Sequence, residues 1–192
     1  MLDPGSISLP LLEKLVCKAS EGNVLIQAIV VPNLVHLEYR PHAWANLAGN
    51  LFNLHTPRYP KTTRLVLKQG VGCPNEVASF QFPAVRHITL HDYGIGILCG
   101  SKREPTTAVY WRELESVTLE DLCGVTEQRE ELIRWLEKRR QMELSNLLVN
   151  LTTSNDWYDF ENISKFCGPT STLYVGSGGC PFRLYSRHHI GK

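Results

Sequence analysis

Histidines and a glycine-rich segment are the residues of this sequence whose spacing most resembles a chemical site. His87 and His91 are four residues apart, the spacing with which two histidines on one helix share a metal ion. They lie, however, in a segment that predicts a β-strand, where positions four apart are separated by about 13 Å. His188 and His189 have no third ligand beside them. A metal site needs three or four convergent ligands, so we expect no metal and no cofactor.

The glycine-rich segment from Gly176 to Gly179 follows a predicted strand, as a phosphate-binding loop would. It lacks the lysine of a P-loop and the spacing of a dinucleotide-binding turn, and it does not match the GxSxG pattern of a nucleophile elbow. Cys180 and Pro181 follow where a helix would have to begin. Glycine and serine are common turn formers, so a turn is the better interpretation. A basic run at the end of the helix predicted at 126–143 could bind phosphate; it consists of Lys138, Arg139 and Arg140. Cations at a helix C-terminus are already explained by the helix dipole.

Six cysteines are scattered along the 192 residues, and none forms a CxxC pair: Cys17, Cys73, Cys99, Cys123, Cys167 and Cys180. The spacing gives no support for a zinc knuckle, and a chain of this length does not need disulfides, so we expect reduced thiols. The net charge of +1 predicts no general attraction to nucleic acid or to a membrane surface. No apolar run approaches the roughly 20 residues of a membrane span. Residues 1–6 lack the pattern of a signal peptide, so an intracellular location is expected.

A recurring phrase organises the chain more clearly than any of these candidates. It consists of an apolar residue, two variable residues, an apolar residue, one variable residue and a last apolar residue. Successive copies are 22, 28, 23, 29, 30 and 26 residues apart, and a strand-like phrase with a period in the twenties is typical of a leucine-rich solenoid. Proline, suited to the start of a strand, precedes four copies by two residues: Pro10, Pro32, Pro60 and Pro83. The middle anchors are Leu15, Leu37, Leu65, Ile88, Val117, Leu147 and Leu173.

Each phrase predicts a short strand, and the gaps are long enough to return the chain for parallel pairing. The gaps predict helices at 126–143, 156–167 and 41–54, one short turn after Pro74, and an exposed loop at 94–107. We therefore expect a single α/β domain over residues 1–192. It would be an irregular leucine-rich-repeat-like solenoid of about seven short parallel strands, with helices and loops on the convex side. Its repeats lie near 10–31, 32–59, 60–82, 83–111, 112–141, 142–167 and 168–192.

Residues that flank the middle and last anchors are expected on the concave face of the sheet. The early strands contribute a mainly basic set, namely Lys14, Lys18, His36, Glu38, Arg40, Arg64, Lys68, His87 and His91. The later strands contribute a mainly polar set, namely Ser116, Thr118, Glu120, Asn146, Asn150, Thr172 and Tyr174. Such a strip would complement a protein partner with an acidic surface. The alternative is an ordinary solvated sheet face.

The phrases at 32–39 and 83–90 and the basic helix end at 132–140 resemble the leucine-rich regions of basidiomycete F-box proteins. The resemblance covers roughly residues 9–176. It implies repeats that select a substrate for a cullin-type ubiquitin ligase, while an F-box binds a Skp-type adaptor. Residues 9–16 predict a strand rather than the opening of an F-box, so an adaptor is expected only if a docking element exists. Leucine-rich repeats usually carry Asn or Cys three residues after the last anchor of each phrase. In this chain those positions are occupied by Ser20, His42, Gly70, Tyr93, Leu122, Thr152 and Gly178.

The sequence therefore predicts a non-catalytic protein-recognition module. Two alternatives remain: a small α/β enzyme with a ligand site near residues 176–179, and a degenerate repeat fragment without retained function. An enzyme predicts one deep pocket lined by convergent polar groups, whereas a recognition module predicts a broad, shallow surface.

Overall fold

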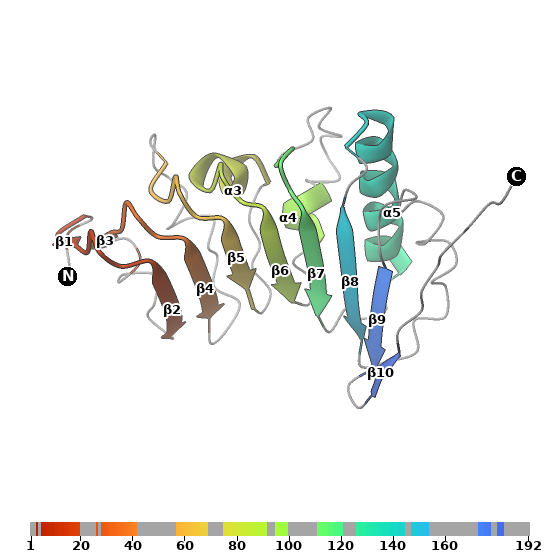
Figure 1. The fold of residues 1–192 in the computed structure, drawn as a ribbon, viewed down its shortest axis with the longest axis horizontal. Helices are drawn as coiled ribbons and strands as arrows, with labels where there is room; N and C mark the ends of the chain where they lie inside the picture. The colour runs from red at the N-terminus through yellow and green to blue at the C-terminus, as the bar shows by residue number, and fades with distance from the viewer. Residues whose placement is uncertain are drawn as a thin grey trace, which may run out of the picture.

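The computed structural model describes residues 3, 5–19, 26, 28–41, 57–68, 75–91, 95–99, 111–120, 126–144, 147–153, 173–177 and 180–182. Their main feature is an eight-stranded sheet in which the strands follow one another in chain order (Figure 1). From one edge to the other these are β2 (Lys14–Ala19), β4 (His36–Pro41), β5 (Arg64–Leu67), β6 (His87–His91), β7 (Ser116–Glu120), β8 (Leu148–Thr153), β9 (Leu173–Ser177) and β10 (Cys180–Phe182).

All pairings from β2 to β9 are parallel, and β10 alone runs antiparallel to its neighbour β9. Two further short strands, β1 (Ile7–Ser8) and β3 (Ile29–Val30), form a separate parallel pair. The expected α/β class with a parallel sheet is confirmed, and a strand is found near each of the seven predicted phrases, the sixth of them displaced by two residues.

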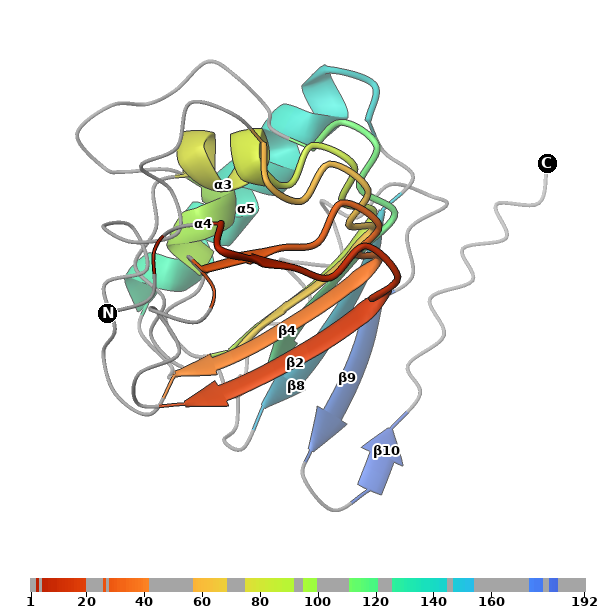
Figure 2. The same ribbon diagram turned by 90° about the vertical axis from the view of Figure 1, so that its left-hand side faces the viewer.

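Three helices lie on one side of the sheet: α3 (Asn75–Gln81), α4 (Gly96–Cys99) and α5 (Thr126–Gln141) (Figure 2). Parallel neighbours need a connection that returns the chain, and each of these helices lies within such a connection. The opposite side of the sheet, called the open face below, carries none of the described helices (Figure 2).

Two of the helices were expected, α5 at nearly its full predicted length and α3 after Pro74. The predicted loop at 94–107 is wrong in part, because α4 occupies Gly96–Cys99. Ile97 and Leu98 are buried there, and their burial outweighs the glycines that suggested a loop. The helices predicted at 41–54 and 156–167 lie outside the described residues, apart from Pro41, which ends β4.

The register aligns the middle anchors of the repeated phrase directly across the sheet. Leu15, Leu37, Leu65, Ile88 and Val117 are consecutive partners. The sixth anchor is Val149, which pairs with Val117 and Leu173, so the prediction of Leu147 at this place is wrong by two residues. Side chains alternate between the two faces of a strand, so a shift of two residues leaves each side chain on its expected face.

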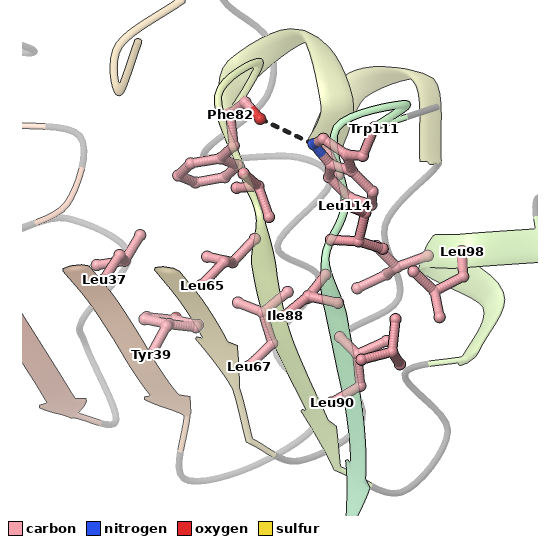
Figure 3. Packing of buried hydrophobic residues seen from close by; sticks show 14 of the residues in the cluster. Leu37, Tyr39, Leu65, Leu67, Phe82, Ile88, Leu90, Leu98, Trp111 and Leu114 are labelled. Carbon is pink, nitrogen blue, oxygen red and sulfur yellow. Dashed lines mark hydrogen bonds between the residues drawn. The ribbon is translucent and has the colours of Figure 1, made fainter. Parts of the chain in front are cut away.

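The anchors form the hydrophobic core between the sheet and the helices (Figure 3). Two buried side chains from each central strand point to this side, for example Leu65 and Leu67 from β5 and Ile88 and Leu90 from β6. They belong to one cluster with helical residues such as Leu98. Burial of each such side chain contributes about 1.5–3 kcal/mol, so the repeated phrase accounts for most of what holds the layers together.

A β-turn precedes each of five strands and explains the repeated proline. An amide donates to the carbonyl three residues earlier at Leu12→Leu9, Leu34→Val31, Thr62→Tyr59, Val85→Phe82 and Leu114→Trp111, over 3.0–3.4 Å. The second position of such a turn favours proline, whose φ is already fixed near the required value. Pro10, Pro32, Pro60 and Pro83 occupy it, and Arg112 takes the place in the fifth turn. The prolines therefore mark the turn before each strand rather than the strand itself.

Side chains connect successive turns. Thr62 Oγ1 donates to the carbonyl of Leu34 over 3.0 Å. Trp111 Nε1 donates to the carbonyl of Phe82 over 2.8 Å (Figure 3). On the surface, Asn33 Nδ2 donates to the carbonyl of Pro10 over 2.8 Å. Each donor belongs to the unit after its acceptor, so these bonds link neighbouring turns at the beginnings of the strands. Of the positions where Asn or Cys is usual, Thr152 lies within β8, and the others lie outside the described residues.

Candidate functional site

The register arranges the open face in three rows that cross the strands. The first row contains Lys14, His36, Arg64, His87, Ser116 and Leu148. The middle row contains Val16, Glu38, Val66, Thr89, Thr118, Asn150 and Tyr174. The third row contains Lys18, Arg40, Lys68, His91, Glu120 and Thr152. Segments more than a hundred residues apart in sequence thus share one surface.

Most of the predicted binding residues are brought together in these rows. Asn146 and Thr172 lie outside the described residues. The displaced register of the sixth phrase puts Leu148, not Asn146, beside Ser116. Tyr174 is placed by its backbone partner Asn150 only.

Ion pairs neutralise part of the third row. Arg40 pairs with Glu38 of the same strand. Lys68 pairs with Glu120 across the intervening strand β6. Arg40 and Lys68 therefore do not act as isolated cations.

The first row is also neutralised at its β6–β7 end. His87 Nδ1 lies 2.9 Å from Ser116 Oγ, and its Nε2 lies 3.7 Å from Glu115 Oε2. Arg86 Nη1 donates to Glu115 Oε1 over 3.0 Å. These contacts supply His87 with a hydroxyl and a carboxylate, so the positive part of the row ends at β5.

At the other end of the first row, His36 lies between two cations. Lys14 on β2 and Arg64 on β5 are its backbone partners on either side. Burial lowers the pKa of His36 below 6.5, and the charges of Lys14 and Arg64 lower it further, against a smaller opposite effect of Glu38. His36 Nε2 is buried and has no hydrogen-bond partner. The imidazole is therefore held neutral between two positive side chains.

Lys14 and Arg64 remain exposed, and within the described part of the chain neither has an ion-pair partner. Lys18 shares this property in the third row. Among the described residues, the lysines and arginines of the open face without an ion-pair partner thus lie on β2 and β5, on either side of β4.

Arg139 was expected only to complement the dipole at the C-terminal end of α5, but the structure shows that it is also buried. Its side chain is only 3% exposed and donates to the carbonyls of Trp111 over 3.2 Å and Leu114 over 3.3 Å. It also lies 5.2 Å from the ring centroid of Trp135. Burial lowers its pKa to about 10. The sequence could have indicated this burial, because Arg139 is seven residues after Leu132 and so falls on the apolar stripe of α5.

Metal and thiol chemistry find little support in the part of the chain that the structure describes. No three His, Cys, Asp or Glu side chains converge there. Cys17 and Cys99 are free thiols, and burial raises the pKa of both, which disfavours the reactive thiolate. None of the described helices has the length and apolarity to cross a bilayer.

The glycine-rich segment is flanked by an antiparallel pair. Gly176 and Ser177 belong to β9, and Ser177 pairs with Cys180 of β10. Residues 178 and 179 lie outside the described residues, so the predicted turn stays a prediction.

Comparison with known proteins adds no further candidate site. No protein-family model, curated protein or solved structure matches this chain. The open face is therefore the surface on which a functional argument has to rest.

Proposed function

We propose that this chain is a leucine-rich-repeat-like solenoid that recognises a protein partner through its open face, without catalysis. The observation that carries the proposal is the in-register row of basic side chains on adjacent strands, two of which, Lys14 and Arg64, have no ion-pair partner among the described residues. A surface of this kind complements an acidic protein surface and steers its approach.

The repeat interpretation is supported by the regularity of the backbone. Each strand of the eight-stranded sheet lies beside the strands that precede and follow it within that sheet. The same turn precedes five of them, and one carbonyl in each of four units accepts two amides of the next, as Glu13 does from Val35 and His36. In a repeat protein each unit contacts only its neighbours, and the shared sheet forms an extended binding surface.

The resemblance to F-box proteins makes substrate selection for a cullin-type ubiquitin ligase the leading biological setting. In that setting the open face would hold the substrate, and a Skp-type adaptor would need a separate docking element. Residues 14–19 form strand β2, which supports the strand interpretation over an F-box for this segment.

Affinity capture from a native lysate at low and moderate salt, followed by mass spectrometry, tests the proposal. The variant to compare carries Lys14→Glu, Lys18→Glu and Arg64→Glu. These cations have no ion-pair partner in the described residues, whereas reversal of Arg40 or Lys68 would place two carboxylates together. We expect a reproducible partner with an acidic surface that is lost with this variant and weakened by salt.

A matched control changes the net charge equally but away from the open face. Arg112, Arg134 and Arg140 are exposed in a turn and on α5, and their replacement by glutamate should leave capture unchanged. A partner retained by the open-face variant, or lost equally with both variants, would contradict the proposed function. Recovery of a Skp-type adaptor or a cullin would support the ligase setting.

A further inference from the structure

We propose that Lys14, His36 and Arg64 form a receptor for a phosphate monoester carried by a side chain of the protein partner. This inference rests on the proposed function, because the same open face would hold the rest of that partner. It adds the chemical class of the group that the first row recognises.

The geometry brings the three residues to one level on adjacent strands. Lys14 pairs with His36, and His36 pairs with Arg64. Neighbouring strands are about 4.8 Å apart, so the two cations originate about 10 Å from each other on either side of the imidazole. Their long side chains can converge over β4 on one tetrahedral group. Segments at residues 14, 36 and 64 are combined here only by the sheet.

The charges favour a doubly negative ligand. Arg40 and Lys68 are each matched by a carboxylate, and His87 lies near Glu115. Lys14 and Arg64 are not matched in the described residues, which leaves about two positive charges around His36. A phosphate monoester carries about −1.5 to −2 charges at pH 7 and three strong acceptor oxygens. A carboxylate would neutralise only one of the two cations.

His36 contributes an unused donor. Its Nε2 is buried without a hydrogen-bond partner, and a buried polar atom without a partner lowers stability by about 1–3 kcal/mol. The neighbouring side chains of Lys14 and Arg64 are exposed, so they can reorient and let a ligand oxygen approach the imidazole. An arginine guanidinium binds phosphate through two parallel bonds, which assigns Arg64 the orienting role and Lys14 that of a point charge.

The boundaries of this site follow from the surrounding residues. On the β6 side, the carboxylate of Glu115 would repel an anion from His87. Toward the middle row, Glu38 is held by Arg40 and remains the nearest acidic group on β4. One phosphate group therefore fits over β4, and an extended run of phosphates along the row does not.

The test is a titration of the full chain with the peptide Gly-Ala-phosphoserine-Ala-Gly, capped at both ends, while the imidazole signals are followed by NMR. The same peptide with aspartate or with unmodified serine serves for comparison. We expect the phosphopeptide to shift the His36 signals, to raise the pKa of His36, and to bind at least about tenfold more tightly than the aspartate peptide. Lys14→Ala or Arg64→Ala should each weaken binding about tenfold.

Arg112→Ala is the matched control, because Arg112 is an exposed cation in the turn before β7, away from the open face. Its removal should change binding less than about twofold. Equal losses from Lys14→Ala and Arg112→Ala would overturn the site in favour of diffuse attraction, as would equal binding of the aspartate peptide. No response of His36 to the phosphopeptide would also overturn it. The affinity capture described above does not require a phosphate group on the partner. A failed phosphopeptide titration would therefore contradict the phosphate receptor and leave the proposed protein recognition to be judged by the capture.

Discussion

Burial affects two titratable side chains of this protein in different ways. Arg139 stays charged at neutral pH, because its pKa falls only to about 10, and two backbone carbonyls and the Trp135 ring surround its guanidinium. His36 lies between two cations, and its pKa is lowered below 6.5. Arg139 stabilises the turn before β7 through Nη1 and Nη2, while its Nε is buried without a hydrogen-bond partner. His36 has a buried Nε2 without a partner on the open face. The structural role of one and the binding role proposed for the other follow from these surroundings.

Replacement of Arg139 by alanine should lower the free energy of unfolding by about 3 kcal/mol, because the buried carbonyls of Trp111 and Leu114 lose a charged donor. Arg139→Lys should recover only part of this loss, since an ammonium group cannot reproduce the guanidinium fork. The neighbouring exposed residue Arg140 is the control, and Arg140→Ala should cost less than about 0.5 kcal/mol. Urea denaturation measures all three variants. Equal effects at positions 139 and 140 would contradict the buried geometry.

His36 gives the protein a defined pH dependence. Its pKa in the folded state lies below its ordinary value of 6.5, so the unfolded chain binds more protons between these two values. Stability should therefore fall as the pH drops below 6.5, and the fall should level off below the pKa of the folded state. NMR titration of the imidazole should show this lowered pKa. It should rise toward 6.5 in a Lys14→Gln, Arg64→Gln variant and stay unchanged in Lys18→Gln; an unchanged value in the double variant would refute the effect of the two charges.

The secondary-structure elements show what sequence patterning can and cannot predict. The seven strands were predicted because each carries apolar residues at fixed spacing, which is a local property. The sixth register was misplaced because Leu144, Leu147 and Val149 match the phrase. The register with Val149 in the middle begins with the polar Asn146, and only pairing with Val117 selects it. Helix α4 was missed because its burial depends on contact with α3 and α5. Proline was recognised as a boundary signal, but its place in a turn follows from the hydrogen bonds.

The turns before the strands allow a direct test of the proline pattern. Pro32→Ala should lower the free energy of unfolding by about 0.4–1 kcal/mol, because the unfolded chain gains backbone freedom. Arg112 occupies the same position of the fifth turn, and Arg112→Ala should have almost no effect of this kind. Thermal or urea denaturation compares the two variants. A cost as large at Arg112 as at Pro32 would show that side-chain contacts, rather than backbone restriction, explain the repeated proline.

At the scale of the whole sheet, the eight strands follow one another in chain order, and each pairs with the strands next to it in that order. The sequence could predict this order from the repeated phrase alone. It could not predict which charges on the open face are neutralised, because partners such as Lys68 and Glu120 are 52 residues apart and meet only across the sheet. The expectation of a basic, partner-binding early half stays a prediction: Arg40 and Lys68 are paired with carboxylates, whereas Lys14, Lys18 and Arg64 have no ion-pair partner among the described residues. Only the register of β2, β4 and β5 shows that Lys14, His36 and Arg64 lie side by side.

A chain ordered in this way should transmit a core defect to its neighbours first. Ile88 lies in the middle of the sheet, buried between Leu65 and Val117, so Ile88→Ala should cost about 2–5 kcal/mol. Because β6 pairs only with β5 and β7, amide exchange should accelerate most in β5, β6 and β7 and less in β2 and β9. Thr89→Ala, one residue further on the open face, should have a much smaller effect. Equal acceleration of amide exchange in all strands would indicate that the sheet unfolds as a single cooperative unit. Such a result would contradict stability that depends mainly on contacts between adjacent strands.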